Sequence, residues 1–324
     1  MKAWNIFYKN VLQNNFVNPG DKIILAVSGG VDSVCMLHLF WRLKKKINFD
    51  LLVVSFNHDL RKESMQESKA VKELSFKFSI DCFIKKINVS KYSKRHSISI
   101  ETAGRRLRYL ILEKIATKYE CNKIATAHNA NDNAETVVMW LLRGSGSFAG
   151  IPQKRALNKN LVVIRPLLPI KRNFIEKYVE AHNLTFSTDE SNFSDIYTRN
   201  KIRMYLIPVF EKINPMAVEH IFNLSCIQAR ENKYLEELSN NFIKKYVKVQ
   251  KNAILLDLTI FLQYNEAVQF RIIKNILPEK NYSSYINLIV RKILSSDVFV
   301  YRISDNWIFE IKSNKVYFIR DGKE

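Results

Sequence analysis

The chain has 324 residues and a formal charge of +20 at pH 7, with 51 lysines and arginines against 31 aspartates and glutamates. This length predicts two or three domains, and the absence of any run of eighteen apolar residues argues against a membrane span. The four cysteines form no CxxC pair, which argues against a disulfide framework and against a zinc or iron–sulfur site.

The basic excess favours a polyanionic partner, with RNA or DNA as the leading candidate. It is concentrated in residues 1–200, which hold 32 basic and 18 acidic side chains, whereas residues 201–324 hold 19 and 13. Coding rich in A and T, which inflates lysine and asparagine, is the alternative explanation of this charge. The first ten residues begin an amphipathic helix and lack the apolar region of a signal peptide, so we expect a cytoplasmic protein.

Strand and helix patterns alternate through the first two hundred residues. They predict strands at 23–27, 51–56, 82–87, 123–127 and 161–164, and helices near 34–45, 63–78, 100–119 and 132–142. Repeated βαβ units of this kind predict an α/β fold, a doubly wound parallel sheet of five strands with helices on both faces. Because ligands bind such sheets beyond the carboxyl ends of the strands, the residues that follow each strand are the candidates for a site.

The loop after the first predicted strand has the sequence SGGVDS and leads directly into an apolar helix. A strand, a glycine-bearing turn and a helix N-terminus favour a phosphate site, because the amides point outward and glycine allows close approach. Asp32 can hold a Mg²⁺ that the phosphates also bind, and the two serines add hydroxyl donors. The alternative is an ordinary turn in which Ser33 or Asp32 caps the helix. The residues of this loop are Ser28, Gly29, Gly30, Val31, Asp32 and Ser33.

Basic residues follow the second strand and open the helix predicted at 100–119. His58 and Arg61 come directly after the second strand, where a loop without function is the structural alternative. Glu101, Arg105 and Arg108 share one face of the helix at spacings of three and four. This spacing fits an ordinary surface salt bridge, and it fits equally an arginine pair aimed at phosphates with Glu101 holding it in place.

A polar cluster follows the fourth predicted strand, at the same sheet end as the SGGVDS loop. It begins with His128 and continues with Asp132 and Glu135 at the start of an apolar helix. Asp132 and Glu135 have the spacing of a capping box, which is the structural interpretation. Two carboxylates at this edge would also face ATP or a cationic substrate. The helix ends at Arg143 in a flexible RGSG loop.

Two further polar segments, 188–192 and 197–203, are typical of loops that carry function. The second contains Arg199 and Arg203, four residues apart. From about residue 205 the pattern changes to a long amphipathic stretch at 215–248, followed by alternating strands at 298–303, 307–311 and 315–319. We place a domain boundary near residue 210.

Eight motifs occur in one order and spacing: SGGVDS, FNHDLR, ETAGRRLRY, ATAHNANDNAET, RGSG, RPLL, DESN and RNKIR. Together they resemble the tRNA(Ile)-lysidine synthetase family, which belongs to the N-type ATP pyrophosphatases with a PP-loop. The match covers about residues 20–210. The resemblance implies an adenine nucleotide alpha hydrolase-like catalytic domain at 1–210, a helical linker at 211–250 and a small α+β tRNA-binding domain at 251–324.

The resemblance implies an ATP-dependent ligase that needs Mg²⁺. Such enzymes adenylate the 2-carbonyl oxygen of the wobble cytidine in tRNA(Ile) with a CAU anticodon, and pyrophosphate leaves. The side-chain amine of free L-lysine then displaces AMP, so that the codon read changes from AUG to AUA. We expect tRNA(Ile) and lysine as partners and no membrane, with a homodimer as an open alternative.

The family's functional residues carry over onto matching positions of this sequence. The resemblance implies Asp32, Asp132, Glu135 and Arg199 as catalytic residues, with Asp32 as the Mg²⁺ ligand and Asp132 and Glu135 as the lysine-binding pair. It implies ATP contacts from residues 28–33, His58, Arg61 and His128. It implies tRNA or phosphate contacts from Arg105, Arg108, Arg143 and Arg203.

Within the ATAHNANDNAET motif the sequence departs from the family at three positions. The family's His-His-x-Asp-Asp-Gln is replaced here, so that Asn129, Asn131 and Asn133 stand for the second His, the first Asp and the Gln.

Three other functions compete with the ligase. A tRNA thiolase of the same fold is disfavoured by the missing cysteine pair, and a small-molecule ligase forming GMP or NAD fits the basic charge poorly. A catalytically relaxed tRNA-binding protein is favoured only by the asparagines.

Overall fold

A computed structural model describes residues 1–57, 63–144, 148–187, 198–277, 283–295, 300–304 and 307–320. The chain divides into two compact units, one formed by Met1–Leu142 with Gly150–Ser225 and the other by Arg143–Ala149 with Cys226–Glu324. The three-part division with boundaries after residues 210 and 250 stays a prediction. None of the described helices is both long and apolar enough to cross a membrane.

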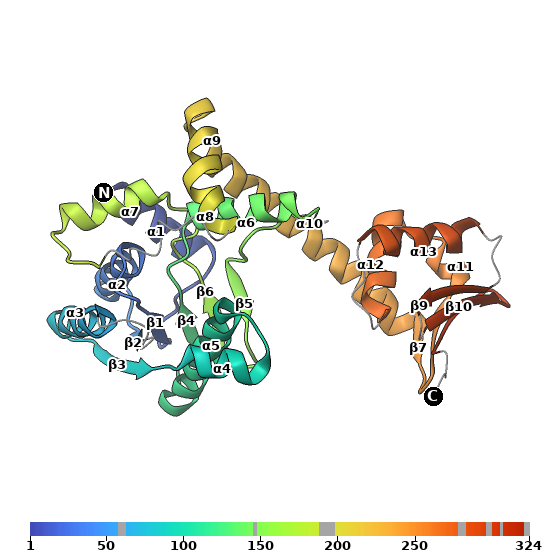
Figure 1. The fold of residues 1–324 in the computed structure, drawn as a ribbon, viewed down its shortest axis with the longest axis horizontal. Helices are drawn as coiled ribbons and strands as arrows, with labels where there is room; N and C mark the ends of the chain where they lie inside the picture. The colour runs from blue at the N-terminus through green and yellow to red at the C-terminus, as the bar shows by residue number, and fades with distance from the viewer. Residues whose placement is uncertain are drawn as a thin grey trace. The chain divides into compact units, whose positions relative to one another are not determined.

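The first unit is built on a six-stranded sheet in the order β3-β2-β1-β4-β6-β5 (Figure 1). The strands are β1 Lys22–Ala26, β2 Asp50–Asn57, β3 Asp81–Lys86, β4 Lys123–Ala125, β5 Lys154–Ala156 and β6 Val162–Ile164. Five of them are parallel, as predicted, and Ile24 of β1 lies opposite both Leu52 and Ile124. The antiparallel edge strand β5 was not predicted.

Helices cover both faces of this sheet. Ile23 and Leu25 of β1 belong to a core that also includes residues of α1, α2 and α7, whereas Ile24 packs in a second core with Leu112 of α5. This alternation is the two-residue period of a strand buried on both faces. The helices of this unit are α1 Lys2–Gln13, α2 Val31–Lys44, α3 Glu63–Lys77, α4 Val89–His96, α5 Ile100–Tyr119, α6 Ala130–Leu142, α7 Arg172–Ala181, α8 Thr198–Lys201, the π-helix η2 Ile202–Leu206 and α9 Ile207–Ile213.

The long amphipathic stretch predicted at 215–248 is one helix, α10 Ala217–Tyr246, which begins in the first unit and ends in the second. The second unit contains an antiparallel sheet in the order β7-β8-β11-β10-β9 and its own apolar core, centred on Leu256, Phe309 and Phe318. The three predicted C-terminal strands are confirmed as β9 to β11. The elements are β7 Val247–Val249, β8 Ala253–Asp257, α11 Leu258–Phe261, α12 Glu266–Ile276, α13 Ser283–Ser295, β9 Val300–Ser304, β10 Trp307–Lys312 and β11 Lys315–Arg320.

Candidate active site

The turn between β1 and α2 presents an uncapped helix N-terminus. Gly30 is the N-cap of α2, and no side chain of the described residues caps it. Gly29 has a φ of +94°, a conformation in which a side chain would be strained. The amides of the first turn of α2 have no partner within the helix, so they are available to an anion at this end. The structure therefore does not support the alternative in which Ser33 or Asp32 caps the helix.

Ser33 holds this loop together from within. Its hydroxyl accepts from the amides of Ser28 and Gly29, at 3.2 and 3.1 Å, and donates to the carbonyl of Gly30 at 2.8 Å. The Ser33 side chain is buried, whereas Ser28 is exposed. Both hydroxyls were predicted as phosphate donors, but the Ser33 proton is engaged by the backbone. Ser28 is the exposed hydroxyl of the two.

Asp32 lies at the junction of three elements, with each carboxylate oxygen held by a different one. Asn129 donates its side-chain amide to Oδ1, and Arg172 of α7 donates Nη1 to Oδ2, both at 2.8 Å. Burial raises the pKa of Asp32 to about 6, although Arg172 counteracts this, and the neighbouring Asp132 adds to the increase. Burial thus makes the charged form of this carboxylate costly, and a cation beside it would offset that cost.

The α6 N-terminus forms a capping box, but not with the predicted pair. The Asn129 side chain accepts from the amide of Asp132, and the Asp132 carboxylate accepts from the amide of Asn129, each at 3.0 Å. Glu135 takes no part in this box. Its side chain is 1% exposed and faces two arginines instead.

Arg199 and Arg203 bind both carboxylates of the acidic pair. Arg199 donates Nε to Glu135 at 2.7 Å and Nη2 to Asp132 at 2.8 Å. Arg203 donates Nε to Glu135 at 2.6 Å, and its Nη2 lies 3.5 Å from Asp132. Burial lowers the pKa of each guanidinium, but the two carboxylates outweigh it and raise both values. The structure thus joins four predicted site residues in one cluster whose formal charges cancel.

Each of the three asparagines that depart from the family pattern bonds to a different element. Asn129 binds Asp32, and the side-chain oxygen of Asn131 accepts from the amide of Arg172 at 3.0 Å. Asn133 accepts from the amide of Ile151 at 2.7 Å and donates to Ser225 of α10 at 2.9 Å. The three side chains therefore connect the start of α6 to the SGGVDS loop, to α7, and to the 150–152 segment and α10.

Close packing around Asn133 requires a glycine at position 150. Gly150 has a φ of +62°, and a Cβ there would lie 2.2 Å from the side-chain oxygen of Asn133. The glycine and the asparagine form one fitted contact, so Asn133 is part of the local architecture.

His128 lies beside a group of arginines. Its Nδ1 is 3.0 Å from the hydroxyl of Thr126, and burial, followed by the charge of Arg165, lowers its pKa to about 3. Arg165 is 1% exposed and donates to the carbonyl of Pro152. The guanidinium of Arg155 lies 4.7 Å from the ring centroid of Tyr109, and that of Arg105 lies 5.6 Å from the same centroid. His128 is therefore a neutral group beside fixed positive charge.

The remaining predicted contacts are less closely joined to this cluster. Arg105 and Arg108 lie on α5, and neither forms an ion pair with Glu101 among the described residues. Arg143 is exposed after the end of α6. His58, Arg61 and the DESN segment lie outside the described residues.

The sequence analysis assigned no role to three arginines: Arg155, Arg172 and Arg165 of the RPLL motif. Arg172 was the most accessible to prediction, because it begins the helix that follows the last parallel strand and therefore lies at the ligand-binding end of the sheet. Its contact with Asp32, 140 residues away, gives no local signal in the sequence.

The residues of this site fit a Mg²⁺ that is shared with phosphates. Mg²⁺ prefers oxygen ligands and is usually bound by one or two carboxylates together with substrate phosphates and water. Asp32 and Asp132 are close enough for the charge of one to raise the pKa of the other. The described residues contain no group of three or more His, Cys, Asp or Glu side chains that could enclose a metal without a substrate.

Comparison with known proteins gives one family model and a set of close relatives. The model described as PP-loop domain matches residues 4–210. A tRNA(Ile)-lysidine synthase from Clostridioides difficile is 35% identical over 94% of this chain and 71% of its own length. Proteins of the same name from Clostridium perfringens and Thermosipho africanus are 38% and 40% identical, over 83% and 75% of this chain. The chain spans only 57% and 55% of those two relatives.

Among solved structures, a U34-tRNA thiolase from Methanococcus maripaludis with its [4Fe-4S] cluster has a similar fold, with a TM-score of 0.60. It is 18% identical, and the match covers 69% of this chain and 76% of the thiolase. At this identity the likeness concerns the fold alone.

Proposed function

The chain belongs to the tRNA(Ile)-lysidine synthase family of PP-loop proteins, and from this premise we propose that it ligates free L-lysine to the wobble cytidine of tRNA(Ile) bearing a CAU anticodon. ATP is consumed to AMP and diphosphate. In the first step the cytidine 2-carbonyl oxygen attacks the α-phosphorus of ATP, and diphosphate leaves. In the second, the lysine side-chain amine attacks C2, the C2–O bond to AMP breaks, and AMP departs with the bonding electrons.

The observation that carries this proposal is the direct connection between the PP-loop and the acidic pair. Asn129 donates to Asp32 of the loop and caps the helix that carries Asp132 and Glu135. An ATP at the loop and a cationic amine at the acidic pair would therefore be held by neighbouring parts of one network. This is the arrangement that a reaction between an adenylated base and lysine needs.

The PP-loop provides the ATP side of this reaction. The first-turn amides of α2, its dipole and the Ser28 hydroxyl would bind the phosphates, and Gly29 allows them to approach the backbone. Asp32 would hold Mg²⁺, which neutralises charge on the departing diphosphate. Arg172 and Asn129 fix the Asp32 carboxylate in position for this role.

The acidic pair provides the lysine side. Lysine brings an ammonium group that competes with Arg199 and Arg203 for the carboxylates of Asp132 and Glu135. A carboxylate freed in this exchange can accept a proton from the attacking amine. The displaced arginine, which we propose to be Arg199, would then bind the lysine carboxylate or the phosphoryl group of the adenylate.

We further propose that the enzyme acts in the cytoplasm, where tRNA, ATP and free lysine occur together. Its basic charge supports tRNA as the partner, since phosphate contacts dominate affinity for RNA.

Transfer of labelled lysine tests the function directly. The chain is incubated with ATP, Mg²⁺, labelled lysine and an unmodified tRNA(Ile) with a CAU anticodon. We expect label in the RNA, dependent on ATP, and none with a methionine tRNA that bears the same anticodon. Label in neither tRNA would favour the catalytically relaxed RNA-binding protein.

A further inference from the structure

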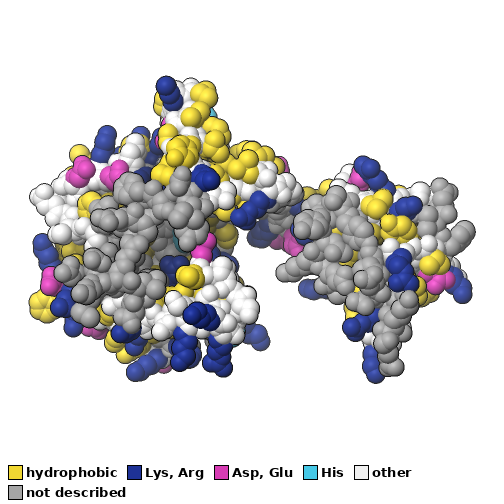
Figure 2. All heavy atoms as spheres, in the orientation of Figure 1, with side chains coloured by type: hydrophobic (Ala, Val, Ile, Leu, Met, Phe, Trp, Pro, Cys, Tyr) yellow, Lys and Arg dark blue, Asp and Glu magenta, His cyan; other side chains and the backbone are white. Residues whose placement is uncertain are grey.

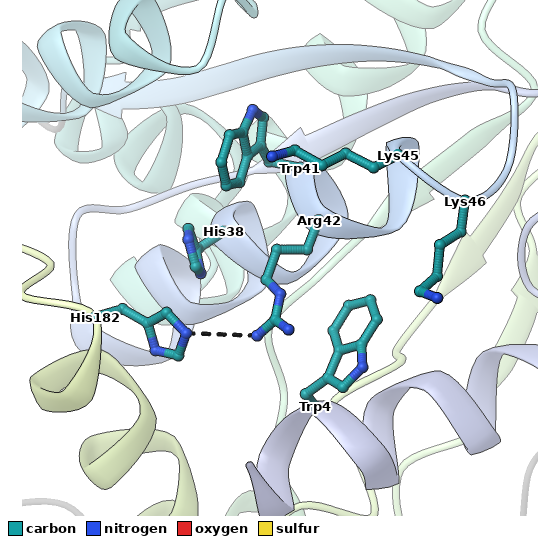
Figure 3. Close-up of a pocket in the computed structure, with 7 residues that line it drawn as sticks. All are labelled: Trp4, His38, Trp41, Arg42, Lys45, Lys46 and His182. Carbon is teal, nitrogen blue, oxygen red and sulfur yellow. Dashed lines mark hydrogen bonds between the residues drawn. The ribbon is translucent and has the colours of Figure 1, made fainter.

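A cavity of about 310 Å³ lies at the C-terminal end of α2, in the first unit (Figure 3). Its walls come from α1, from the end of α2 with the turn that follows, and from the residue after α7. They contain two indoles, two imidazoles and three cationic side chains. The lining residues are Trp4, His38, Trp41, Arg42, Lys45, Lys46 and His182.

This cavity is separate from the candidate active site. Asp32 lies in the first turn of α2 and Arg42 in its last turn, ten residues apart, which at 1.5 Å per residue is about 15 Å. Helix α7 repeats the arrangement, because Arg172 contacts Asp32 while His182 follows its C-terminal end. Helices α2 and α7 therefore have the candidate active site at their N-terminal ends and the cavity at their C-terminal ends.

The three cations of the cavity contact aromatic rings. Arg42 stacks over Trp4 at 4.4 Å, Lys45 over Trp41 at 4.0 Å, and Lys46 lies 5.6 Å from the ring of Tyr8. None of the carboxylates in the described ranges forms an ion pair with them, although the adjacent Lys44 pairs with Asp50. Nη1 of Arg42 donates to the hydroxyl of Tyr178 at 3.1 Å and lies 3.4 Å from Nε2 of His182, the contact drawn in Figure 3. The aromatic contacts restrict the three side chains, but they leave Nε and Nη2 of Arg42 and the two ammonium groups available to an anion.

His38 is a neutral side chain of this cavity at neutral pH. The His38 and His182 ring centroids are 4.8 Å apart, and Nδ1 of His38 lies 2.8 Å from the hydroxyl of Tyr178. Burial lowers the pKa of His38 to about 4, and the charges of His182 and Arg42 lower it further in the same direction. Arg42, Lys45 and Lys46 supply the permanent positive charges of the cavity.

We propose that this cavity binds a ribose phosphate of an RNA strand. Arg42 offers a planar fork that matches phosphate oxygens, and the two lysines supply mobile point charges beside it. The volume exceeds what one inorganic phosphate fills, and a basic surface interleaved with aromatic rings is typical of single-strand RNA contacts. An acidic peptide would satisfy the charge and could also pair with the guanidinium fork, so the interleaved aromatic rings are what favour RNA. The proposal relies on the proposed function only in taking tRNA as the RNA.

Tryptophan fluorescence can test this without ATP, lysine or a cytidine substrate. The chain has four tryptophans, and a Trp140→Phe/Trp307→Phe background leaves the two cavity indoles as the emitters. The probes are hexauridylate, uridine 5′-monophosphate, inorganic phosphate and hexaglutamate. We expect saturable quenching by hexauridylate, with weaker binding of the other three.

A matched pair of double variants identifies the site. Lys45→Gln/Lys46→Gln should weaken hexauridylate binding about tenfold or more, because two charge-assisted contacts are lost. Lys85→Gln/Lys118→Gln is the control, since these lysines also contact an aromatic pair, at 5.9 Å from Phe83 and 5.4 Å from Tyr119. It removes the same charge outside the cavity, and we expect binding within about twofold of the parent.

Each contrary result overturns the proposal. No binding of hexauridylate, or equal weakening in both double variants, would show that the cavity is not the RNA contact. Equal affinity for uridine monophosphate or phosphate would assign it to a small anion, and equal affinity for hexaglutamate to an acidic peptide. A chain that fails to form lysidine can still pass this test, so the two proposals fail separately.

Discussion

The two ends of helix α2 differ in how their charged side chains are paired. At its N-terminal end Asp32 pairs with Arg172, and the nearby Asp132 and Glu135 pair with Arg199 and Arg203. At its C-terminal end three cations face aromatic rings, and no carboxylate of the described residues forms an ion pair with them. Paired charges of both signs suit an exchange with a zwitterion such as lysine, whereas unpaired cations suit a ligand of one sign.

The largest expected effect is at the paired end. Asp32→Ala removes the carboxylate on which Asn129 and Arg172 converge, and with it the proposed Mg²⁺ ligand. We expect tRNA-dependent diphosphate release to fall by about a thousandfold or more. Asp50→Ala, which removes an exposed aspartate that pairs with Lys44, is the control and should keep its activity. Turnover retained in Asp32→Ala would exclude the loop from phosphate chemistry.

Glu135→Gln tests whether the acidic pair serves lysine or the nucleotide. It replaces a carboxylate that accepts from both Arg199 and Arg203, and that we propose binds the lysine ammonium. Loss of one charge-assisted contact should raise the KM for lysine about ten- to hundredfold and leave the KM for ATP within about twofold. Glu237→Gln, which breaks the exposed pair with Lys233 on α10, is the matched control. Equal increases in both KM values would assign Glu135 to ATP.

The sequence predicts contacts that depend on local order and misses those that depend on packing. Asp32, Asp132 and Glu135 were identifiable because each follows a strand whose carboxyl end faces the ligand. The sheet order and the cavity were harder. Trp4 and His182 meet through the packing of α1, α2 and α7 on one core, and no spacing in the sequence encodes that meeting. Strand β5 has three residues and a polar sequence, so it carries no periodic signal.

The asparagines illustrate the same limit. From sequence alone Asn129 counted as a departure from a family pattern, whereas in the fold it joins a capping box to the Asp32 carboxylate. An asparagine offers one acceptor and two donors, and the capping box uses the acceptor while Asp32 takes a donor. Only the position of α2 beside α6 makes the second bond possible.

A smaller effect is expected from Asn129→Ala, which removes both the N-cap of α6 and the hydrogen bond to Asp32. Loss of the N-cap should cost about 1 kcal/mol in the free energy of unfolding. Loss of the bond to Asp32 should lower the rate of diphosphate release about tenfold, since the carboxylate is then held by Arg172 alone. Asn88→Ala is the control, because Asn88 caps α4 by the same bond, to the amide of Lys91, on a helix that contributes no residue to the candidate site. It should match the stability loss in chemical denaturation and leave the rate unchanged. A rate equally low in Asn88→Ala would mean that the effect is stability alone.

The smallest expected effect is on the salt dependence of tRNA binding. This measurement compares the two ends of α2 directly. Each cation that neutralises a phosphate releases counterions. Loss of one such cation therefore makes the plot of log affinity against log salt shallower, reducing the magnitude of its slope by about 0.7–0.9. Lys45→Gln/Lys46→Gln should therefore lower the slope by about one to two units. Arg203→Gln should change it by less than about half a unit, because this guanidinium is already neutralised by Glu135 and Asp132. A slope lowered as much by Arg203→Gln would mean that RNA draws the arginine away from its carboxylates. The paired end of α2 would then be a phosphate site as well, as the family resemblance implies for Arg203.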